Sequence, residues 1–153
     1  MTARIELDAI DRTLLRRLQQ DGRTSYTDLG REVRLSAQAV RTRVQRLMES
    51  GVLQIAAVTD PLALGLPVMA LLGIKVDRNL REITDALGDI DNVIYLVATA
   101  GSFDLFAEVV CRTMDELSAV INDRVRSIPG VRAVESFPYF GIHVHRFTWD
   151  VPD

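Results

Sequence analysis

Residues 25–51 read S-Y-T-D-L-G-R-E-V-R-L-S-A-Q-A-V-R-T-R-V-Q-R-L-M-E-S-G, and the rest of the first half of the chain is arranged around them. Two short helical patterns lie in this stretch, and each opens with a serine, Ser25 or Ser36, whose hydroxyl can cap a helix. Arg34 and Leu35 form a tight turn between the two patterns. Two short helices joined by such a turn predict a helix-turn-helix.

The second helical pattern has an apolar side and a polar side. At about 100° per residue, Val40, Val44 and Leu47 fall on one narrow stripe, which we expect to face inward. The opposite side is an outward row of hydrogen-bonding side chains: Gln38, Arg41, Thr42 and Gln45. Glutamine pairs with adenine and arginine with guanine in a DNA major groove, so this row predicts base contacts. Without the helix-turn-helix around it, the same row would be a solvated polar face with no partner.

Three other residues of this helix are candidates for contacts with the DNA backbone. Arg43 and Arg46 flank the row, where phosphate contacts set the register of a protein on DNA without reading sequence. Arg43 is equally consistent with an internal salt bridge. Ser36 is predicted to cap the helix, and the backbone N–H groups beside it can also hold a phosphate. Double-stranded DNA is therefore the predicted partner of this region.

The charge distribution favours the same partner. The whole chain has a formal net charge of −3, yet residues 31–46 hold five arginines against one glutamate. A basic island on an acidic protein indicates a polyanion contact confined to one face. Charge alone is weak support, because arginine-rich helix faces are usually just solvated.

The composition excludes several classes of protein. With 153 residues, of which 48% are hydrophobic and 25% charged, the chain is typical of a soluble globular protein. No apolar run approaches the roughly 18 residues of a membrane span. The N-terminus lacks the apolar core of a secretory signal, so we expect a cytoplasmic protein with no membrane partner. Cys111 is the only cysteine, which excludes an intramolecular disulfide and predicts a small buried hydrophobe.

The flanks of the helix-turn-helix indicate the domain boundaries. Asp8 can cap a first helix whose apolar residues recur at four-residue spacing. Gly51 ends the last helix, and V-L-Q-I-A-A-V follows as a predicted short strand, a wing or a dimer arm. We therefore expect a winged helix-turn-helix DNA-binding domain over 1–52, a wing strand and linker over 53–66, and a second domain over 67–153.

The second domain has the pattern strand, helix, strand, strand, helix, strand. The expected strands cover 68–76, 93–99, 105–111 and 131–139, with a last strand around 142–149, and the expected helices cover 79–87 and 114–128. Two βαβ halves of this kind match the ferredoxin-like βαββαβ fold, so the predicted class is α+β. Two helices cover only one face of such a sheet. We therefore predict a homodimer made through the other face.

Several short motifs follow one another along nearly the whole chain. They are L-D-x-x-D, D-G-R-x-S, L-S-x-x-x-V-x-x-R-V-x-R-L and G-V-L, and later T-A-G-S-F-D and I-P-G-V. Each motif is weak alone, but their order and spacing together are specific. On these motifs the chain resembles the Lrp/AsnC (leucine-responsive, or feast/famine) family of transcription regulators.

The resemblance implies a winged helix-turn-helix joined to a ferredoxin-like effector domain. It also implies dimers that assemble further, commonly to octamers, and a response to amino acids. Members of the family usually carry glycine where this chain has Arg34. If that turn needs a positive φ, arginine costs roughly 1 kcal/mol there, or it adds a phosphate contact. The family's effector loop usually has Thr-Gly or Ser-Gly, whereas here Ala100 precedes Gly101 and Thr99 is displaced by one.

The loop between the second and third strands of this domain is the candidate effector site. Its candidate residues are Thr99, Ala100, Gly101, Ser102 and Asp104. Glycine permits close approach of a small ligand, and exposed backbone amides can take a carboxylate. Asp104 can bind the ammonium group of an amino acid. On the residues alone, a glycine-containing turn capped by Asp104 is at least as good an interpretation, and the resemblance favours the effector site.

No catalytic, cofactor or metal site is predicted. His143 and His145 alternate along the last expected strand, a spacing that can offer two imidazoles to a metal, but no cysteine or carboxylate cluster accompanies them, which favours structural or surface roles. No nucleophile–base pair or phosphate loop supports an enzyme. The sequence thus predicts a sequence-specific DNA-binding transcription regulator whose assembly or DNA binding responds to a small effector, an amino acid. The alternative is an architectural nucleoid-type DNA-binding protein without an effector.

Overall fold

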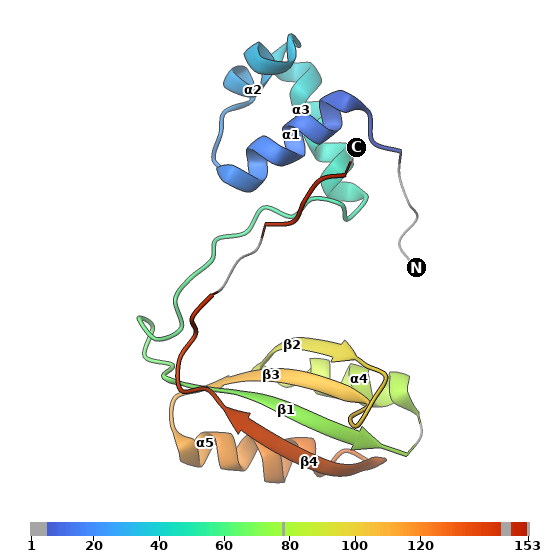
Figure 1. The fold of residues 1–153 in the computed structure, drawn as a ribbon, viewed down its shortest axis with the longest axis vertical. Coiled ribbons are helices and arrows are strands. Elements are labelled where there is room, and N and C mark those ends of the chain that lie inside the picture. Colours follow the sequence, from blue (N-terminus) through green and yellow to red (C-terminus); the bar gives the residue numbers. More distant parts are fainter. Residues whose placement is uncertain (1–5, 78, 145–147, 153) are drawn as a thin grey trace. The chain divides into compact units, whose positions relative to one another are not determined.

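The computed structural model describes residues 6–77, 79–144 and 148–152. The chain divides into two compact units, one made of Met1–Val58 with His145–Asp153 and the other of Thr59–Val144. Each unit has its own hydrophobic core. Figure 1 shows the elements of both units. Within the described ranges, no helix has the length and apolar character needed to cross a membrane.

The first unit is built from three helices that begin at the predicted caps. They are α1 (Ala9–Gln20), α2 (Tyr26–Val33) and α3 (Ala37–Glu49). The Asp8 carboxylate accepts from the backbone N–H of Asp11, and the Asp11 side chain accepts from the backbone N–H of Asp8, which forms a reciprocal capping box. Ser25 and Ser36 cap α2 and α3 in the predicted way. The predicted helix-turn-helix is confirmed.

The core of the first unit lies between these helices. Its buried apolar residues are Leu14, Leu15, Leu18, Leu29, Val40, Val44, Leu47, Leu53 and Val151. The stripe predicted on α3 is therefore confirmed, since Val40, Val44 and Leu47 are fully buried. Burying a side chain of this size stabilises a fold by about 1.5–3 kcal/mol, so the stripe alone fixes which side of α3 faces out.

The C-terminal segment completes this core. Val151 is only 7% exposed and packs in the helical cluster. Arg16 donates to the carbonyl of Val151 at 2.8 Å, and Arg12 donates through Nε to the carbonyl of Pro152 at 2.9 Å. The division of the chain therefore differs from the expected one, which assigned residues 67–153 to the second domain.

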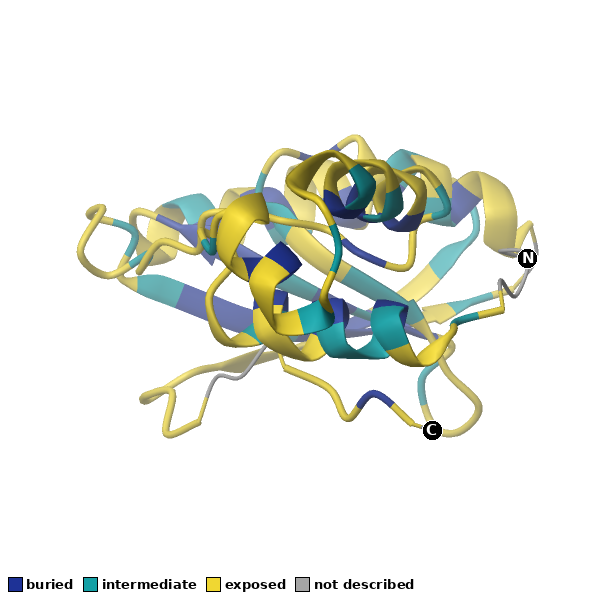
Figure 2. Cartoon of the chain, turned by 90° about the horizontal axis from the view of Figure 1, so that it is seen from above, coloured by how far each residue is buried: buried dark blue, intermediate teal, exposed yellow. Residues whose placement is uncertain are grey.

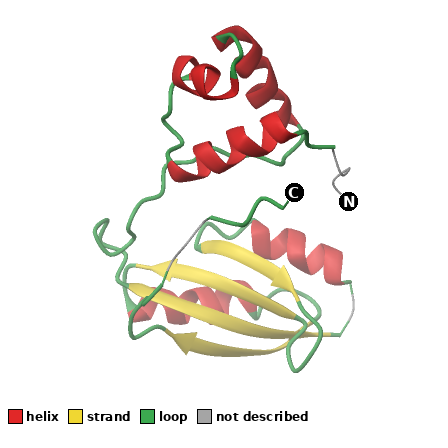
Figure 3. Cartoon of the chain, turned by 45° about the horizontal axis from the view of Figure 1, so that its top comes forward, coloured by secondary structure: helices red, strands yellow, loops and turns green. Residues whose placement is uncertain are grey.

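The second unit is a four-stranded antiparallel sheet with strand order β2-β3-β1-β4. Its elements are β1 (Val68–Val76), α4 (Leu80–Gly88), β2 (Val93–Ala98), β3 (Leu105–Cys111), α5 (Met114–Ala119), a π-helical turn η1 (Val120–Val125) and β4 (Val131–Pro138). This order of elements and strands is the predicted ferredoxin-like fold. Figure 3 shows α4 and α5 on the same side of the sheet.

Alternate residues of the strands form the core of this unit. Ala70, Leu72 and Ile74 on β1 are fully buried against the helices, as is Cys111, the small hydrophobe that the sequence predicts. The second helix differs from expectation in its last turns. Arg126 donates its backbone N–H to the carbonyl of Ile121 at 2.9 Å, a five-residue step that widens the helix into η1.

The other face of the sheet has no covering layer in the described chain. One row of paired residues crosses all four strands on this face: Tyr95, Glu108, Leu71 and Phe137. Tyr95 is 58% exposed and Phe137 is 44% exposed. We call this surface, with the residues that lie beside this row, the open sheet face. It is the face through which the sequence predicts dimerisation.

Two predicted strands are not formed in the described residues. Residues 52–58, expected as a wing, and the described parts of 142–149 run as extended chain without strand pairing. A strand requires a neighbouring strand to take its backbone hydrogen bonds, and neither segment has one among the residues that the structure describes. Residues 54–60 and 139–144, which lie in the segments between the two units, are exposed, as are most of the loops in Figure 2.

Candidate nucleic-acid interface and effector loop

The outward side of α3 carries the predicted base-contacting row in an exposed state. Gln38, Arg41, Thr42 and Gln45 are all exposed, opposite the buried stripe. Thr42 donates its hydroxyl to the carbonyl of Gln38 at 3.1 Å, and Gln45 donates its amide to Glu49 at 3.0 Å. Arg41 forms no hydrogen bond or ion pair within the part of the chain that the structure describes. Its guanidinium donors are therefore available to a ligand.

The two flanking arginines of α3 bind a buried carboxylate on α1. Asp11 is 1% exposed, the lone charged residue among the buried positions that the structure describes. Arg43 donates through one nitrogen to Asp11 at 2.9 Å and to Asp8 at 2.7 Å, while Arg46 donates to the second oxygen of Asp11. The salt-bridge interpretation of Arg43 is thus realised. Arg46, whose side chain is half exposed, also has an internal partner.

These ion pairs shift the pKa values of the groups that make them. The backbone N–H of Asp11 and the guanidinium of Arg43 lower the pKa of the Asp8 carboxyl. Hydrogen bonds to Asp8 and Asp11 raise the pKa of Arg43. Both shifts favour the charged forms, so the contact between α1 and α3 is an ion pair at neutral pH. It fixes the rotation of α3 relative to α1 in addition to the apolar stripe.

The turn between α2 and α3 holds Arg34 in a left-handed conformation. Its φ is 57° and its ψ is 43°, and its backbone N–H donates to the carbonyl of Gly30. Residue 34 therefore does adopt a positive φ, and a residue other than glycine costs about 1 kcal/mol of stability at this position. Residue 30 must be glycine for steric reasons, because a Cβ there would lie 2.5 Å from the carbonyl oxygen of Leu35.

The effector loop is a closed turn that is bonded to β1. Thr99 donates its backbone N–H to the carbonyl of Asp104 at 2.9 Å and its hydroxyl to the carbonyl of Phe103 at 2.7 Å. Asp104 donates its backbone N–H to Ile74, and its Oδ2 accepts from the backbone N–H of Val76 at 2.8 Å. The Asp104 carboxylate thus holds the end of β1 through one oxygen, and within the described chain it accepts no hydrogen bond from a residue of its own turn.

The tip of this loop is open to a ligand. Ala100, Gly101 and Ser102 are exposed, and none of them makes a hydrogen bond within the described chain. A Cβ added at Gly101 would meet nothing within 4 Å, so a small molecule can approach the backbone there. The structure therefore brings the predicted effector residues together on one turn, with amides at the tip and a carboxylate at the base.

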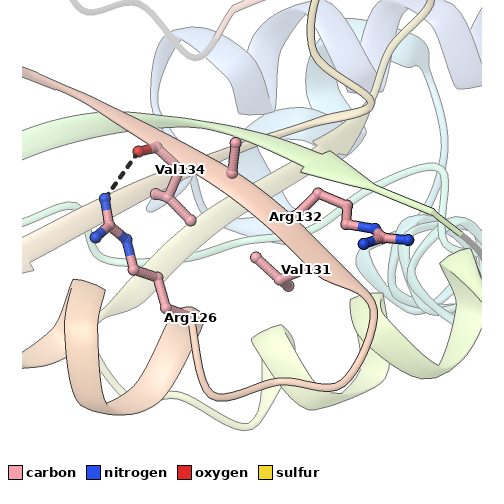
Figure 4. Close-up of a pocket in the computed structure, with 5 residues that line it drawn as sticks. Arg126, Val131, Arg132 and Val134 are labelled. Carbon is pink, nitrogen blue, oxygen red and sulfur yellow. Dashed lines mark hydrogen bonds between the residues drawn. The ribbon is translucent and has the colours of Figure 1, made fainter.

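A separate open cavity of about 360 Å³ lies between the end of η1 and β4 (Figure 4). It is lined by Arg126, Val131, Arg132, Ala133 and Val134. Both of its cations have partners, because Arg126 donates to the carbonyl of Val134 and Arg132 pairs with Asp77 at 2.7 Å. The cavity therefore offers no free charge to an anion.

Sequence reasoning missed three residues that organise these sites. Asp11 has a local role as an acid in the first turn of α1, and its pairing with α3 spans more than 30 residues. Phe103 lies inside the effector loop, and Gly73 lies opposite it on β1. A glycine within an apolar strand run is a known sign of close approach, so Gly73 was detectable in the sequence. His143 is exposed, whereas His145 lies outside the described residues.

Comparisons with known proteins cover both units. The family model of the AsnC-type helix-turn-helix domain matches residues 7–48, and that of the Lrp/AsnC ligand-binding domain matches residues 69–148. An uncharacterised HTH-type transcriptional regulator of Pyrococcus abyssi is 33% identical over 135 residues, which are 87% of this chain and 85% of the relative.

Two solved structures illustrate the structural similarity. The leucine response regulatory protein LrpA of Mycobacterium tuberculosis is 29% identical, with a TM-score of 0.84 over 91% of this chain and 96% of that chain. A Neisseria meningitidis transcriptional regulator solved as a complex with L-Met is 23% identical, with a TM-score of 0.80 over 95% of this chain and 97% of that chain. The second likeness concerns the fold alone.

Proposed function

The chain belongs to the Lrp/AsnC family of transcription regulators, and on that premise we propose that it reads a specific DNA sequence through α3 and responds to an amino acid. One observation carries the first half of the proposal. The row Gln38, Arg41, Thr42 and Gln45 is exposed, while the opposite side of α3 is fully buried. A helix fixed from behind with exposed polar side chains in front is suited to a major groove.

The arginines of α3 have two different roles in this proposal. Arg41, which has no partner among the described residues, reads a guanine through two hydrogen bonds, worth about 1–3 kcal/mol of discrimination. Arg43 and Arg46 are held by Asp11, and their remaining N–H donors meet phosphates. The same ion pairs that orient α3 therefore set the positions of the phosphate-binding groups.

We place the dimer interface on the open sheet face. Aromatic side chains gather there without a covering layer in the described chain, and apolar surface of this kind favours association. Two α3 helices on such a dimer would enter successive major grooves about 34 Å apart. Further assembly, to an octamer, is the expectation that the family resemblance adds.

A pair of charge insertions tests this interface. Phe137→Glu places a carboxylate on the open sheet face, and Ser136→Glu places one on the preceding residue of β4, which lies on the opposite side of the sheet. Sedimentation velocity should show a monomer for Phe137→Glu and a dimer for Ser136→Glu. Equal assembly of the two variants would remove the open sheet face as the interface.

The effector is an amino acid held at the tip of the loop. The exposed amides of Gly101 and Ser102 take its carboxylate, and the free oxygen of Asp104 takes its ammonium group. The name of LrpA and the L-Met complex of the Neisseria protein concern those proteins, and they support an amino acid as the first class of ligand to test.

Footprinting on the DNA upstream of the protein's own gene, repeated with each common amino acid, tests the whole proposal. Sharp, phased protection that changes with at least one amino acid is expected. Protection that spreads without a defined edge, and that no amino acid alters, would instead indicate an architectural DNA-binding protein.

Two substitutions test the assigned residues. Arg41→Ala should relax specificity at one base position, because the arginine is proposed to read a single guanine. Asp104→Asn keeps an acceptor for the N–H of Val76 but removes the charge, so it should abolish the amino-acid effect and leave DNA affinity intact. Uniform losses on matched and scrambled DNA for Arg41→Ala would contradict its reading role.

A further inference from the structure

Gly73, in the middle of β1, is required by a ring that lies on it. A Cβ at this position would lie 2.9 Å from three ring atoms of Phe103, closer than real Cβ contacts come. Gly73 is not among the described residues with positive φ, so its backbone gives no reason for glycine. Glycine is therefore present here because it lets the Phe103 ring lie directly on the backbone of the strand.

The Phe103 ring belongs to the aromatic cluster of the open sheet face. It meets the ring of Phe106 edge-on at 5.4 Å between centroids and the ring of Phe137 at 6.2 Å. The ammonium group of Lys75 lies 5.6 Å from the centre of the same ring. Phe103 is also a residue of the effector loop, because its carbonyl accepts the hydroxyl of Thr99. One residue thus belongs to both sites, through its ring on the open sheet face and through its backbone in the loop.

The rest of the effector loop leaves little freedom between the two sites. Both ends of the loop are bonded to each other, and Asp104 is bonded twice to β1. The exposed tip, residues 100–102, is therefore the part that a ligand can rearrange. A rearranged tip moves the next residue, Phe103, whose ring has no space to shift toward the strand beneath it.

We propose that Phe103, seated on Gly73, is a positioning residue that links effector binding to dimerisation. This inference rests on the proposed function, because it joins the proposed effector loop to the proposed interface. The loop conformation that holds the amino acid is the one that presents the ring correctly to the partner's sheet. Linkage then requires that the amino acid tightens the dimer by the same factor by which dimerisation tightens the amino acid.

Two variants disturb this contact from opposite sides, and two variants serve as controls. Gly73→Ala displaces the ring with one methyl group, and Phe103→Ala removes the ring. Gly88→Ala is the matched glycine control, because a Cβ there would meet nothing within 4 Å. Phe103→Tyr retains the ring and is the conservative variant that should restore the behaviour of the unchanged chain.

The experiment measures two constants on each full-length variant. Sedimentation velocity over a dilution series gives the dimer dissociation constant, and calorimetry with each of the common amino acids gives the ligand affinity. Gly73→Ala and Phe103→Ala should weaken both by about tenfold, since each loses aromatic contacts of roughly 1–1.5 kcal/mol. Gly88→Ala and Phe103→Tyr should leave both constants within about twofold of those of the unchanged chain.

Separate outcomes decide the inference and the proposed function. If Gly73→Ala and Phe103→Ala weaken the dimer but leave amino-acid affinity unchanged, the link is refuted and the proposed function stands. If the unchanged chain binds no amino acid, the proposed effector fails, and hydrogen exchange of residues 99–104 decides the link. Dimerisation should then protect these amides in the unchanged chain and not in Gly73→Ala, and equal exchange in monomer and dimer would refute the link.

Discussion

The helix-turn-helix unit and the ligand-binding unit hold their functional segments by different interactions. In the first, the buried carboxylate of Asp11 binds Arg43 and Arg46 and so fixes α3 to α1. In the second, the effector loop lies on β1 through backbone hydrogen bonds and through the ring of Phe103 over Gly73. An ion pair responds to charge and pH, whereas a contact fitted by shape responds to a single methyl group. Perturbations of each kind should therefore separate the two units.

The largest expected effect tests whether the units are energetically separate. Leu47→Ala in the first core and Leu72→Ala in the second each remove a fully buried side chain, at a cost of about 3 kcal/mol. Each variant should lower the unfolding transition of its own unit alone. Hydrogen exchange of α3 and of β1 would report them separately, and a common loss of protection would mean one cooperative unit.

A smaller effect is expected when the buried carboxylate is removed. Asp11→Ala leaves two guanidinium groups without their shared partner and should destabilise the first unit by about 2 kcal/mol, since both arginines retain some access to water. Glu32→Ala is the control, because its pair with Arg17 is exposed and contributes at most about 1 kcal/mol. Urea unfolding, followed by the signal of the helices, measures the free energy of unfolding of both variants. Equal losses of stability in Asp11→Ala and Glu32→Ala would contradict the importance of Asp11.

A substitution in the turn between α2 and α3 should raise the stability of the first unit instead of lowering it. Arg34→Gly relieves a left-handed conformation and should stabilise the first unit by about 1 kcal/mol. Arg31→Gly, within α2, should destabilise it by about 1 kcal/mol, because glycine is a poor helix former. Thermal unfolding of the two variants gives the comparison. A loss of stability for Arg34→Gly would mean that the arginine side chain makes a stabilising contact.

The smallest expected effect is the pH dependence of the stability that Asp8 contributes, which separates the charge of this side chain from its role as a helix cap. The hydrogen bond from the backbone N–H of Asp11 and the guanidinium of Arg43 hold the folded pKa of Asp8 below its ordinary value of 3.8, so the stability that the Asp8 carboxylate contributes is complete above that value and is lost as the pH falls through the lowered pKa. Asp8→Asn keeps a good cap and should cost less than about 1 kcal/mol at neutral pH. The difference in urea midpoint from the unchanged chain should shrink as the pH falls below the ordinary carboxyl pKa and through the lowered pKa of Asp8. A constant difference at every pH would exclude ionisation as its source.

Local patterns account for the parts of the fold that the sequence predicts correctly. The caps at Ser25 and Ser36 act within three residues, and the stripe through Val44 follows the helical period, so both are visible in a short window. The strands of the second unit are likewise visible as apolar runs, and their order follows from the ferredoxin-like connection of two βαβ halves.

Interactions between distant residues account for what the sequence does not predict. Asp11 meets α3 across more than 30 residues, and Phe103 meets Gly73 across a similar separation. Each of these residues has an adequate local role, in a helical first turn, a loop or a strand, so nothing local indicates the second role. Val151 is the extreme case, because an isolated valine near Pro152 carries no periodic signal.

The placement of Val151 in the first core has a consequence for biosynthesis. A ribosome releases α1, α2 and α3 early, but the residue that completes their core is made only after the entire ligand-binding unit. During translation the second unit therefore has all of its strands before the first unit has all of its core. The core of the nascent helical unit therefore lacks the Val151 side chain until residues 148–152 have been synthesised and can fold back onto it.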